Sequence, residues 1–367
     1  MIILKARTSS PFFSRFHRFF ATKRTSLPFL LFSLVLSPLA FPYLCVVTFR
    51  RLCARTHDPG VPVVSVGNIT AGGTGKTLLV GLLTGYFLDR GKRVAVAGHG
   101  VGAEKGVRIA SGGSAAGDLA GFGDEGAMLA GRFPRLVIAA GGKKSDLVRR
   151  LAARPDRPSV IIIDDGFHVH DVKKSINIVT VDAERPFDNG LPLPAGCLRD
   201  LPSSLKRAGV IVVHRSAGTD ERTVVSVEER LRRYGAPVFR MSDTAVCFHD
   251  AKGAVYGLDL LRGKRILAFA GIGKPMNFFR LLATLEPERV FSVVYPDHFR
   301  YRKEDWKELL VLAGENGADI AVSTGKDREK ILRVGGEGIP LYFLEITGVI
   351  SAKDGRDFFD IVNRSIV

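Results

Sequence analysis

The amino-acid sequence predicts an α/β protein that has a P-loop, a doubly wound and mostly parallel sheet, a second, smaller α/β domain and an N-terminal membrane helix. Three observations lead to this prediction. An uncharged apolar stretch lies near the N-terminus, a glycine-rich loop joins a strand-like run to a helix-like run, and further apolar runs alternate with segments of helix length. With 367 residues, of which 46% are hydrophobic, the chain is long enough for two domains and too apolar to be disordered.

The apolar stretch extends from Leu27 to Phe49 without a charged residue. It is longer than the roughly 20 residues that a helix needs to cross a bilayer core. Pro38 and Pro42 lie inside it, so a straight span and a kinked or re-entrant helix are both open. We therefore expect a membrane helix over residues 26–50.

The segment before this helix, residues 1–25, is basic and aromatic. Five phenylalanines recur there at helical spacing, namely Phe12, Phe13, Phe16, Phe19 and Phe20. An aromatic face with cations beside it is typical of a helix in the headgroup layer. We expect an interfacial segment; a disordered tail or a targeting segment is the alternative.

The net charge of +16 raises the question of nucleic-acid binding. More than half of the excess positive charge precedes Asp58, the first acidic residue, so the charge accompanies the membrane segment. No RNA- or DNA-binding motif is present, and we expect no nucleic-acid partner. The four cysteines form no CxxC pair and have no histidines at zinc-ligand spacing, which predicts a reducing compartment and no metal framework.

Apolar runs of strand length divide the rest of the chain into two α/β regions. A P-loop domain is expected over residues 58–240, a hairpin linker over 241–262 and a second α/β domain over 263–367. The expected strands of the first domain are Val61 to Val66, Val94 to Ala97, Leu136 to Ala140, Val160 to Ile163, Ile176 to Val181 and Val210 to Val213. Those of the second domain are Ile266 to Ala270, Val290 to Val294, Ile320 to Val322 and Leu341 to Phe343.

The glycine-rich loop is the strongest local signal for function. Such a loop, placed between a strand and a helix, presents backbone N–H groups to the phosphates of a nucleotide. Lys76 would reach the β- and γ-phosphates, and Thr77 would ligate Mg²⁺. Thr70 replaces the first glycine of the usual pattern, which leaves a structural turn as the alternative. The expected nucleotide-binding residues are Thr70, Gly72, Gly73, Thr74, Gly75, Lys76 and Thr77.

Asp164 and Asp165 follow the strand Val160 to Ile163, at the strand end where open α/β sheets bind their ligands. P-loop enzymes place an Mg²⁺-holding aspartate there. Adjacent acids at a strand end are also common turn or helix caps. Together with the glycine-rich loop, they predict a metal site.

Phosphoryl transfer to a hydroxyl group also needs a base on the acceptor side. Asp124 precedes an apolar helix, where an N-cap is the alternative. His298 follows a predicted strand in Pro296-Asp297-His298, where a simply solvated side chain is the alternative. Their spacing in the sequence does not pair them.

The stretch from Val64 to Thr77 resembles the opening motif of the tetraacyldisaccharide 4'-kinases of lipid A synthesis, which have the same nonstandard loop. The similarity extends in order over residues 60–330. It includes Gly123-Asp124-Glu125, Asp164-Asp165-Gly166-Phe167, Asn189-Gly190, Leu193-Pro194-Ala195-Gly196, Leu198-Arg199, Gly271-Ile272-Gly273, Pro296-Asp297-His298, Thr324 and Lys326-Asp327.

The resemblance implies a kinase that transfers the γ-phosphate of ATP to the 4'-hydroxyl of tetraacyldisaccharide 1-phosphate, with Mg²⁺ as cofactor. It implies that Asp124 is the catalytic base, that His298 assists it, and that Arg199 lies near the transferred phosphate; a surface salt bridge is the alternative for Arg199. It further implies contact with lipids of the inner membrane, with the catalytic domains on the cytoplasmic face.

The sequence departs from the family pattern at three places. His99 and Val101 replace the arginine and tyrosine of a Ser-Arg-Gly-Tyr-Gly motif, His168-Val169 replaces a Gln-His pair, and Leu78 replaces a proline. A histidine does not replace a bidentate arginine at a phosphate. Two other functions therefore stay open: a membrane-anchored P-loop NTPase switch, and a catalytically degenerate regulator that binds nucleotide.

Overall fold

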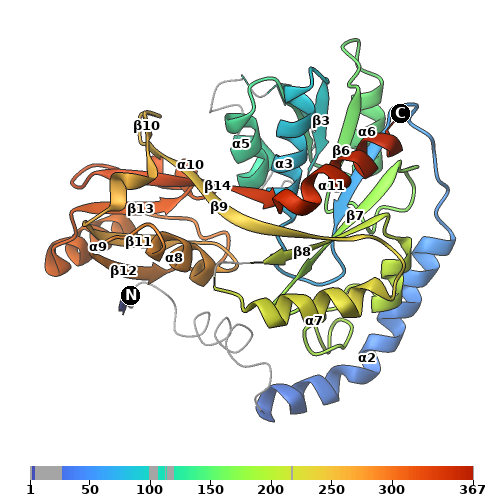
Figure 1. The fold of residues 1–367 in the computed structure, drawn as a ribbon, viewed down its shortest axis with the longest axis horizontal. Coiled ribbons are helices and arrows are strands. Elements are labelled where there is room, and N and C mark those ends of the chain that lie inside the picture. The colour runs from blue at the N-terminus through green and yellow to red at the C-terminus, as the bar shows by residue number, and fades with distance from the viewer. Residues whose placement is uncertain are drawn as a thin grey trace. The chain divides into compact units, whose positions relative to one another are not determined.

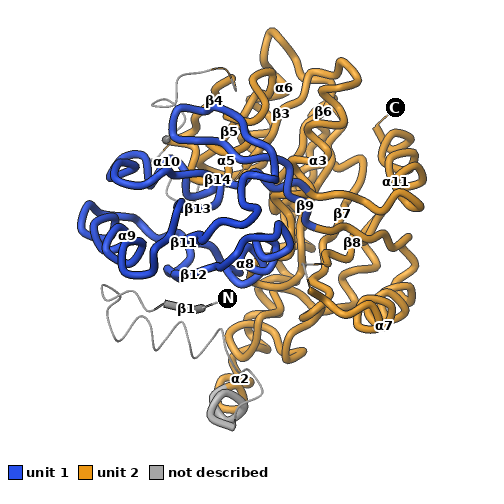
Figure 2. Tube along the Cα trace, turned by 60° about the vertical axis from the view of Figure 1, so that its left-hand side comes forward, with its two compact units in different colours: residues 1–23, 243–347 blue, residues 24–242, 348–367 orange. Residues whose placement is uncertain are grey.

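The computed structural model describes residues 2–4, 27–98, 106–111, 113, 120–215 and 218–366. The chain divides into two compact units (Figure 2). Unit 1 contains residues 1–23 and 243–347, and unit 2 contains residues 24–242 and 348–367. The phenylalanine-rich segment expected at the membrane interface lies outside the described residues, as do His99 and Val101. Upstream of it, β1 (Ile2–Leu4) pairs in parallel with β12 (Arg289–Val294).

Unit 2 is built on a mostly parallel sheet with the strand order β9-β8-β7-β2-β6-β3-β5-β4 (Figure 1). All described pairings in this run are parallel except that of β4 with β5 at the edge. The order reverses direction on either side of β2, as in a doubly wound fold. The strands are β2 (Val63–Gly67), β3 (Val94–Ala97), β4 (Arg108–Ser111), β5 (Val137–Ala140), β6 (Val160–Asp164), β7 (Ile176–Asp182), β8 (Val210–Arg215) and β9 (Val238–Asp250).

Helices cover both faces of this sheet, which explains why its strands are apolar on both sides. On one face, α3 and α11 pack on alternate residues of β2, β6, β7 and β8. On the other face, α6 packs on β3 and β6, and α7 packs on β7 and β8. The helices are α3 (Lys76–Asp89), α5 (Gly123–Arg132), α6 (Lys144–Ala152), α7 (Glu221–Arg232) and α11 (Ala352–Ser365), with short 3-10 helices at Ala120–Phe122 and Pro202–Arg207.

Helix α2 (Leu27–Leu52) is the apolar segment expected from the sequence, and it is one continuous helix that includes Pro38 and Pro42. Residues Ser33–Leu52 are long and apolar enough to cross a membrane, with a mean hydropathy of 1.5. From Ser33 onward, where its side chains are described, most large apolar side chains of α2 are exposed, Val35 and Phe41 to more than 70%. An apolar surface of this kind predicts contact with lipid.

Unit 1 contains a parallel sheet with the order β12-β11-β13-β14. Its further strands are β11 (Arg265–Ala270), β13 (Ile320–Thr324) and β14 (Leu341–Ile350), and its helices are α8 (Pro275–Ala283), α9 (Lys303–Asn316), α10 (Arg328–Leu332) and the 3-10 helix Leu258–Leu261. Strand β10 (Val255–Tyr256) pairs antiparallel with the end of β9, which forms a hairpin. Within the described residues, the chain passes between the units in β9 and again in β14.

Candidate active site

The glycine-rich loop lies between β2 and α3, as the sequence predicts. Gly75 precedes α3 with a φ of 80°, and Gly72 has a φ of 121°, values that an L side chain rarely adopts. A Cβ atom on Gly75 would lie 2.7 Å from the imidazole ring of His214. A Cβ atom on Gly72 or Gly73 would meet no atom within 4 Å, so the backbone is open to a phosphate at those residues.

Buried hydroxyl and amide groups hold the loop in this shape. The hydroxyl groups of Thr74 and Thr180 lie 2.7 Å apart, and the Thr180 hydroxyl also donates to the carbonyl oxygen of Gly67 at 3.2 Å. The Asn68 amide donates to the carbonyl oxygen of Thr70 at 2.6 Å. These contacts give Thr70 and Thr74 a structural role in the loop.

A second segment runs beside the loop and carries Arg199. The N–H of Ala71 donates to the carbonyl oxygen of Cys197, and the N–H of Arg199 donates to the carbonyl oxygen of Ile69, both at 2.7 Å. Thr70 and Leu198 form an antiparallel bridge between these hydrogen bonds. This short ladder fixes the backbone of Arg199 next to the loop.

Asp164 and Asp165 follow each other at the carboxyl end of β6, adjacent to β2. Asp165 has a φ of 53°, which turns the chain back so that the N–H of Gly166 donates to the carbonyl oxygen of Val66 at 2.8 Å. Lys144, the first residue of α6, is buried beneath this turn. Its ammonium group donates to the carbonyl oxygens of Asp164 at 2.6 Å and Asp165 at 2.8 Å.

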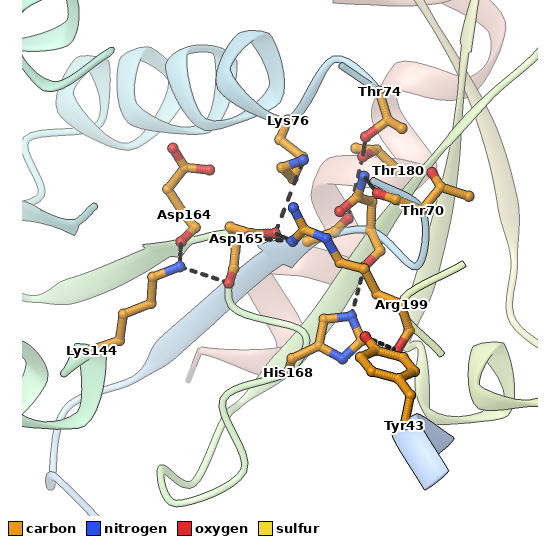
Figure 3. Close-up of polar contacts among 12 residues, drawn as sticks. Tyr43, Thr70, Thr74, Lys76, Lys144, Asp164, Asp165, His168, Thr180 and Arg199 are labelled. Carbon is orange, nitrogen blue, oxygen red and sulfur yellow. Dashed lines mark hydrogen bonds and ion pairs between the residues drawn. The ribbon is translucent and has the colours of Figure 1, made fainter. Parts of the chain in front are cut away.

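The side chains of Lys76, Asp165 and Arg199 form one charged cluster (Figure 3). Arg199 Nη1 donates to both carboxylate oxygens of Asp165, at 2.8 and 3.1 Å, and Lys76 Nζ lies 4.0 Å from Asp165 Oδ1. Burial alone would raise the pKa of Asp165, but the cations Lys76, Lys144 and Arg199 outweigh burial and lower this pKa to about 2. Asp165 therefore carries a negative charge at neutral pH.

The pKa of Asp164 is shifted in the opposite direction. Burial, followed by the negative charge of Glu125, raises the pKa of Asp164 to about 6. Among the described residues, no hydrogen-bond partner faces its buried Oδ1 atom. An unpaired, buried carboxylate oxygen beside a second carboxylate is a suitable ligand for a hard divalent cation. Thr77, in the first turn of α3, has the hydroxyl group that binds Mg²⁺ in P-loop proteins. The donor groups of Thr77, Asp164 and Asp165 therefore fit Mg²⁺.

Asp124 lies in the first turn of α5. The charge of the neighbouring Glu125 affects the pKa of both Asp164 and Lys76, so this end of α5 faces the acidic pair. The structure thus brings the start of α5 to the same strand ends as the glycine-rich loop. Asp124 belongs to unit 2.

His298 belongs to unit 1, in a turn after β12. Its φ is 57°, and its N–H donates to the carbonyl oxygen of Gly271 at 3.1 Å. Its Nε2 atom lies 3.9 Å from Asp297 Oδ2. Asp327 in turn accepts a hydrogen bond from the N–H of Gly271 at 2.9 Å, so three of the motifs quoted above meet at the carboxyl ends of β11, β12 and β13. The pairing of His298 with Asp124 stays a prediction.

Sequence reasoning missed three contributors to the site. Lys144 lies in no recognisable motif, although its ammonium group donates to the carbonyl oxygens of Asp164 and Asp165. Tyr43 of α2 donates from its hydroxyl group to the carbonyl oxygen of Arg199 at 3.1 Å, which no spacing in the sequence could indicate. His168, noted as a departure from the family, lies with Nε2 3.2 Å from the carbonyl oxygen of Asn68, at the start of the loop (Figure 3).

Comparisons with known proteins give the same assignment. The tetraacyldisaccharide-1-P 4'-kinase family matches residues 32–362. The chain belongs to this family. The sequence resemblance described above is therefore confirmed. The curated tetraacyldisaccharide 4'-kinase of Syntrophus aciditrophicus is 37% identical over 77% of the chain and 79% of the relative. That of Halothermothrix orenii is 31% identical over 90% of the chain and 92% of the relative.

A solved structure of the family has the same fold. The crystal structure of LpxK from Aquifex aeolicus in complex with ATP covers 91% of this chain and 99% of its own, with a TM-score of 0.68 and 24% identity. The predicted fold class, a P-loop α/β protein with a mostly parallel sheet, is confirmed by this likeness.

Proposed function

We propose that this protein transfers the γ-phosphate of ATP to the 4'-hydroxyl of tetraacyldisaccharide 1-phosphate in lipid A synthesis. The observation that carries the proposal is the cluster of Lys76, Asp165 and Arg199 beside an open glycine-rich loop. Relatives that cover most of the chain are named as kinases of this disaccharide, and the similar crystal structure contains ATP.

The loop and its cations would bind and orient the triphosphate. Backbone N–H groups at Gly72 and Gly73 would contact phosphate oxygens, and Lys76 would reach the β- and γ-phosphates. Arg199, held through its backbone by Ile69, would stabilise the negative charge on the transferred group. The charged pair with Asp165 keeps the guanidinium group oriented before the nucleotide arrives.

Thr77, Asp164 and Asp165 would hold Mg²⁺, which neutralises phosphate charge when it is bound. The cation would also stabilise the charged form of Asp164, whose pKa is raised by burial and by the negative charge of Glu125.

Asp124 would accept the proton of the 4'-hydroxyl, and His298 would orient Asp124 and share that proton. The support for these roles is the match of both motifs to the family and the position of Asp124 next to Glu125. Asp124 belongs to unit 2 and His298 to unit 1.

Cations near the end of α2 support an anionic lipid as the acceptor. Burial and the neighbouring charge of Arg207 lower the pKa of Lys174 to about 7. Burial, Arg207 and Lys174 lower the pKa of His170 to about 4, and the charge of Arg51 in the last turn of α2 adds to this effect. The lowered pKa leaves His170 uncharged at neutral pH, but Arg207 and Arg51, whose positive charges contribute to this shift, would attract an anion. We infer that they face phosphorylated lipid on the cytoplasmic side of the inner membrane, with α2 as the anchor.

The proposal is tested by incubating the purified full-length protein with Mg-ATP and tetraacyldisaccharide 1-phosphate. We expect mass spectrometry to detect one added phosphate. Lys76→Ala and Asp124→Asn should abolish the product, whereas Lys173→Ala, a lysine that is 68% exposed, should not. ATP hydrolysis that ignores the lipid and survives Asp124→Asn would instead identify an NTPase switch. ATP binding without transfer would identify a regulator.

A further inference from the structure

Three side chains that the proposed kinase reaction does not use converge in unit 1. Cys247 and His249 lie on β9, and Glu345 lies on the neighbouring strand β14. Residues two apart in a strand point to the same face, so Cys247 and His249 are presented together. The donor atoms of all three residues lie within 4.8 Å of one another, and each side chain is half-buried. This set is called the Cys-His-Glu cluster below.

The contacts within the cluster converge on one point and do not form a chain. His249 Nε2 lies 3.4 Å from Cys247 Sγ and 2.8 Å from Glu345 Oε2, and Sγ lies 3.9 Å from Oε2. In a nucleophilic relay the imidazole ring would use one nitrogen for the thiol and the other for the carboxylate. Here the same nitrogen faces both groups, which is the arrangement of ligands around a shared ion.

We propose that the Cys-His-Glu cluster binds a divalent transition-metal ion, with Zn²⁺ as the expected occupant. Thiolate, imidazole and carboxylate together are ligands of Zn²⁺, and three protein ligands leave a fourth position for water. Mg²⁺ prefers oxygen ligands in an octahedron, so the cluster differs in chemistry from the acidic pair of the kinase site.

The observed distances are close to those that Zn²⁺ requires. From Zn–S bonds of about 2.3 Å and Zn–N or Zn–O bonds of about 2.0–2.1 Å, tetrahedral coordination places the sulfur about 3.5 Å from each of the other donors and the nitrogen about 3.4 Å from the oxygen. The sulfur–nitrogen distance of 3.4 Å already agrees. A shift of Glu345 Oε2 by about 0.5 Å, away from Nε2 and toward Sγ, would complete the site.

The metal would connect the two strands in which the chain passes between units. It would displace the thiol proton of Cys247, so binding should weaken as the pH falls. It would also protect this sulfur from oxidation. The sequence spacing Cys-x-His, with its third ligand almost a hundred residues away, explains why a search for closely spaced zinc ligands finds nothing.

The test uses full-length protein that has been stripped of metal and titrated with Co²⁺. We expect a near-ultraviolet thiolate-to-cobalt absorption band that saturates at one equivalent and disappears when Zn²⁺ is added, because Zn²⁺ binds such sites more tightly. Cobalt at Thr77, Asp164 and Asp165 would give no such band, because that site has no sulfur. Cys247→Ser should remove the band, and His249→Gln should weaken cobalt binding about tenfold or more.

Cys53→Ser is the matched control, because Cys53 is a free and exposed cysteine on the other unit. It should leave the band unchanged. Stabilisation by ATP against thermal unfolding, measured for each variant, verifies that the fold is intact; if Cys247→Ser fails this check, Glu345→Gln replaces it, with the same weakening expected as for His249→Gln. The proposal is overturned if wild-type protein gives no thiolate band with stoichiometric Co²⁺, or if the band survives Cys247→Ser.

Discussion

Replacing Asp164 by asparagine should stabilise the metal-free protein at alkaline pH while it removes a proposed Mg²⁺ ligand. Burial and Glu125 raise the pKa of Asp164 from its ordinary value of 3.8 to about 6. At about 1.4 kcal/mol per pH unit, this difference corresponds to a penalty on the order of 3 kcal/mol for the ionised form. When folding raises the pKa of a carboxyl group, the group destabilises the folded state at pH values above its pKa in the folded protein. It has no effect on stability at pH values below its pKa in the unfolded chain. The penalty is therefore full above pH 6 and vanishes toward pH 4.

We expect Asp164→Asn to raise the free energy of unfolding by about 1–3 kcal/mol at pH 8 and by almost nothing at pH 3, below the ordinary carboxyl pKa. Urea denaturation followed by far-ultraviolet circular dichroism, with EDTA present, measures both values. Asp58→Asn is the control: Asp58 is exposed and its pKa is lowered, chiefly by the hydrogen bond from Lys173, so no gain is expected. An equal gain at both pH values, or none at pH 8, would show that the charge of Asp164 is not what destabilises this turn.

Three further predictions concern the same site. Lys144→Met should lower the free energy of unfolding by about 2–4 kcal/mol, because the carbonyl oxygens of Asp164 and Asp165 lose a charged hydrogen-bond donor. Lys143→Met, at the exposed neighbouring residue, should leave this free energy unchanged, and urea denaturation measures both variants. Arg199→Lys keeps the charge but loses the guanidinium bridge to Asp165, so kcat/KM should fall at least about tenfold and the Asp165 pKa, followed by NMR, should rise. Gly67→Ala places a Cβ atom 2.5 Å from the Cβ atom of Phe167, so Tm should fall sharply. A Cβ atom at residue 73 meets no atom within 4 Å, so Gly73→Ala should keep Tm unchanged but weaken ATP binding, as measured by calorimetry.

The regular parts of the fold could be predicted because each buried strand is a continuous apolar run. The expected strand Val94 to Ala97 agrees with β3 at both ends, and the expected run Ile176 to Val181 differs from β7 by one residue. β4, at the sheet edge, was missed because a four-residue strand with mixed polarity resembles a loop. The position of α11 was also not predictable, because its amphipathic pattern indicates a buried face without indicating which sheet covers it.

The parts of the site that lie within one short segment could be predicted from the sequence, and the contacts between distant segments could not. The glycine-rich loop and the acidic pair each lie in one short segment, so their chemistry could be read from neighbouring residues. Arg199 was found through its motif, but its contact with Asp165 depends on a bridge between Thr70 and Leu198 that only the folded chain provides. Lys144 and Tyr43 act through backbone carbonyl oxygens, which every residue has, so no sequence pattern reveals them.

Helix α11 packs against the sheet of unit 2. Phe358 and Val362 of α11 are fully buried in the core that also contains Val64 and Leu83, while residues 243–347 form the intervening unit. During synthesis on the ribosome, the domain that emerges first therefore lacks part of its apolar core until α11 has been made. A chain truncated between residues 242 and 352 would lack α11 and would leave part of this apolar core exposed to water, so the growing chain exposes apolar surface for longer than the order of its strands suggests.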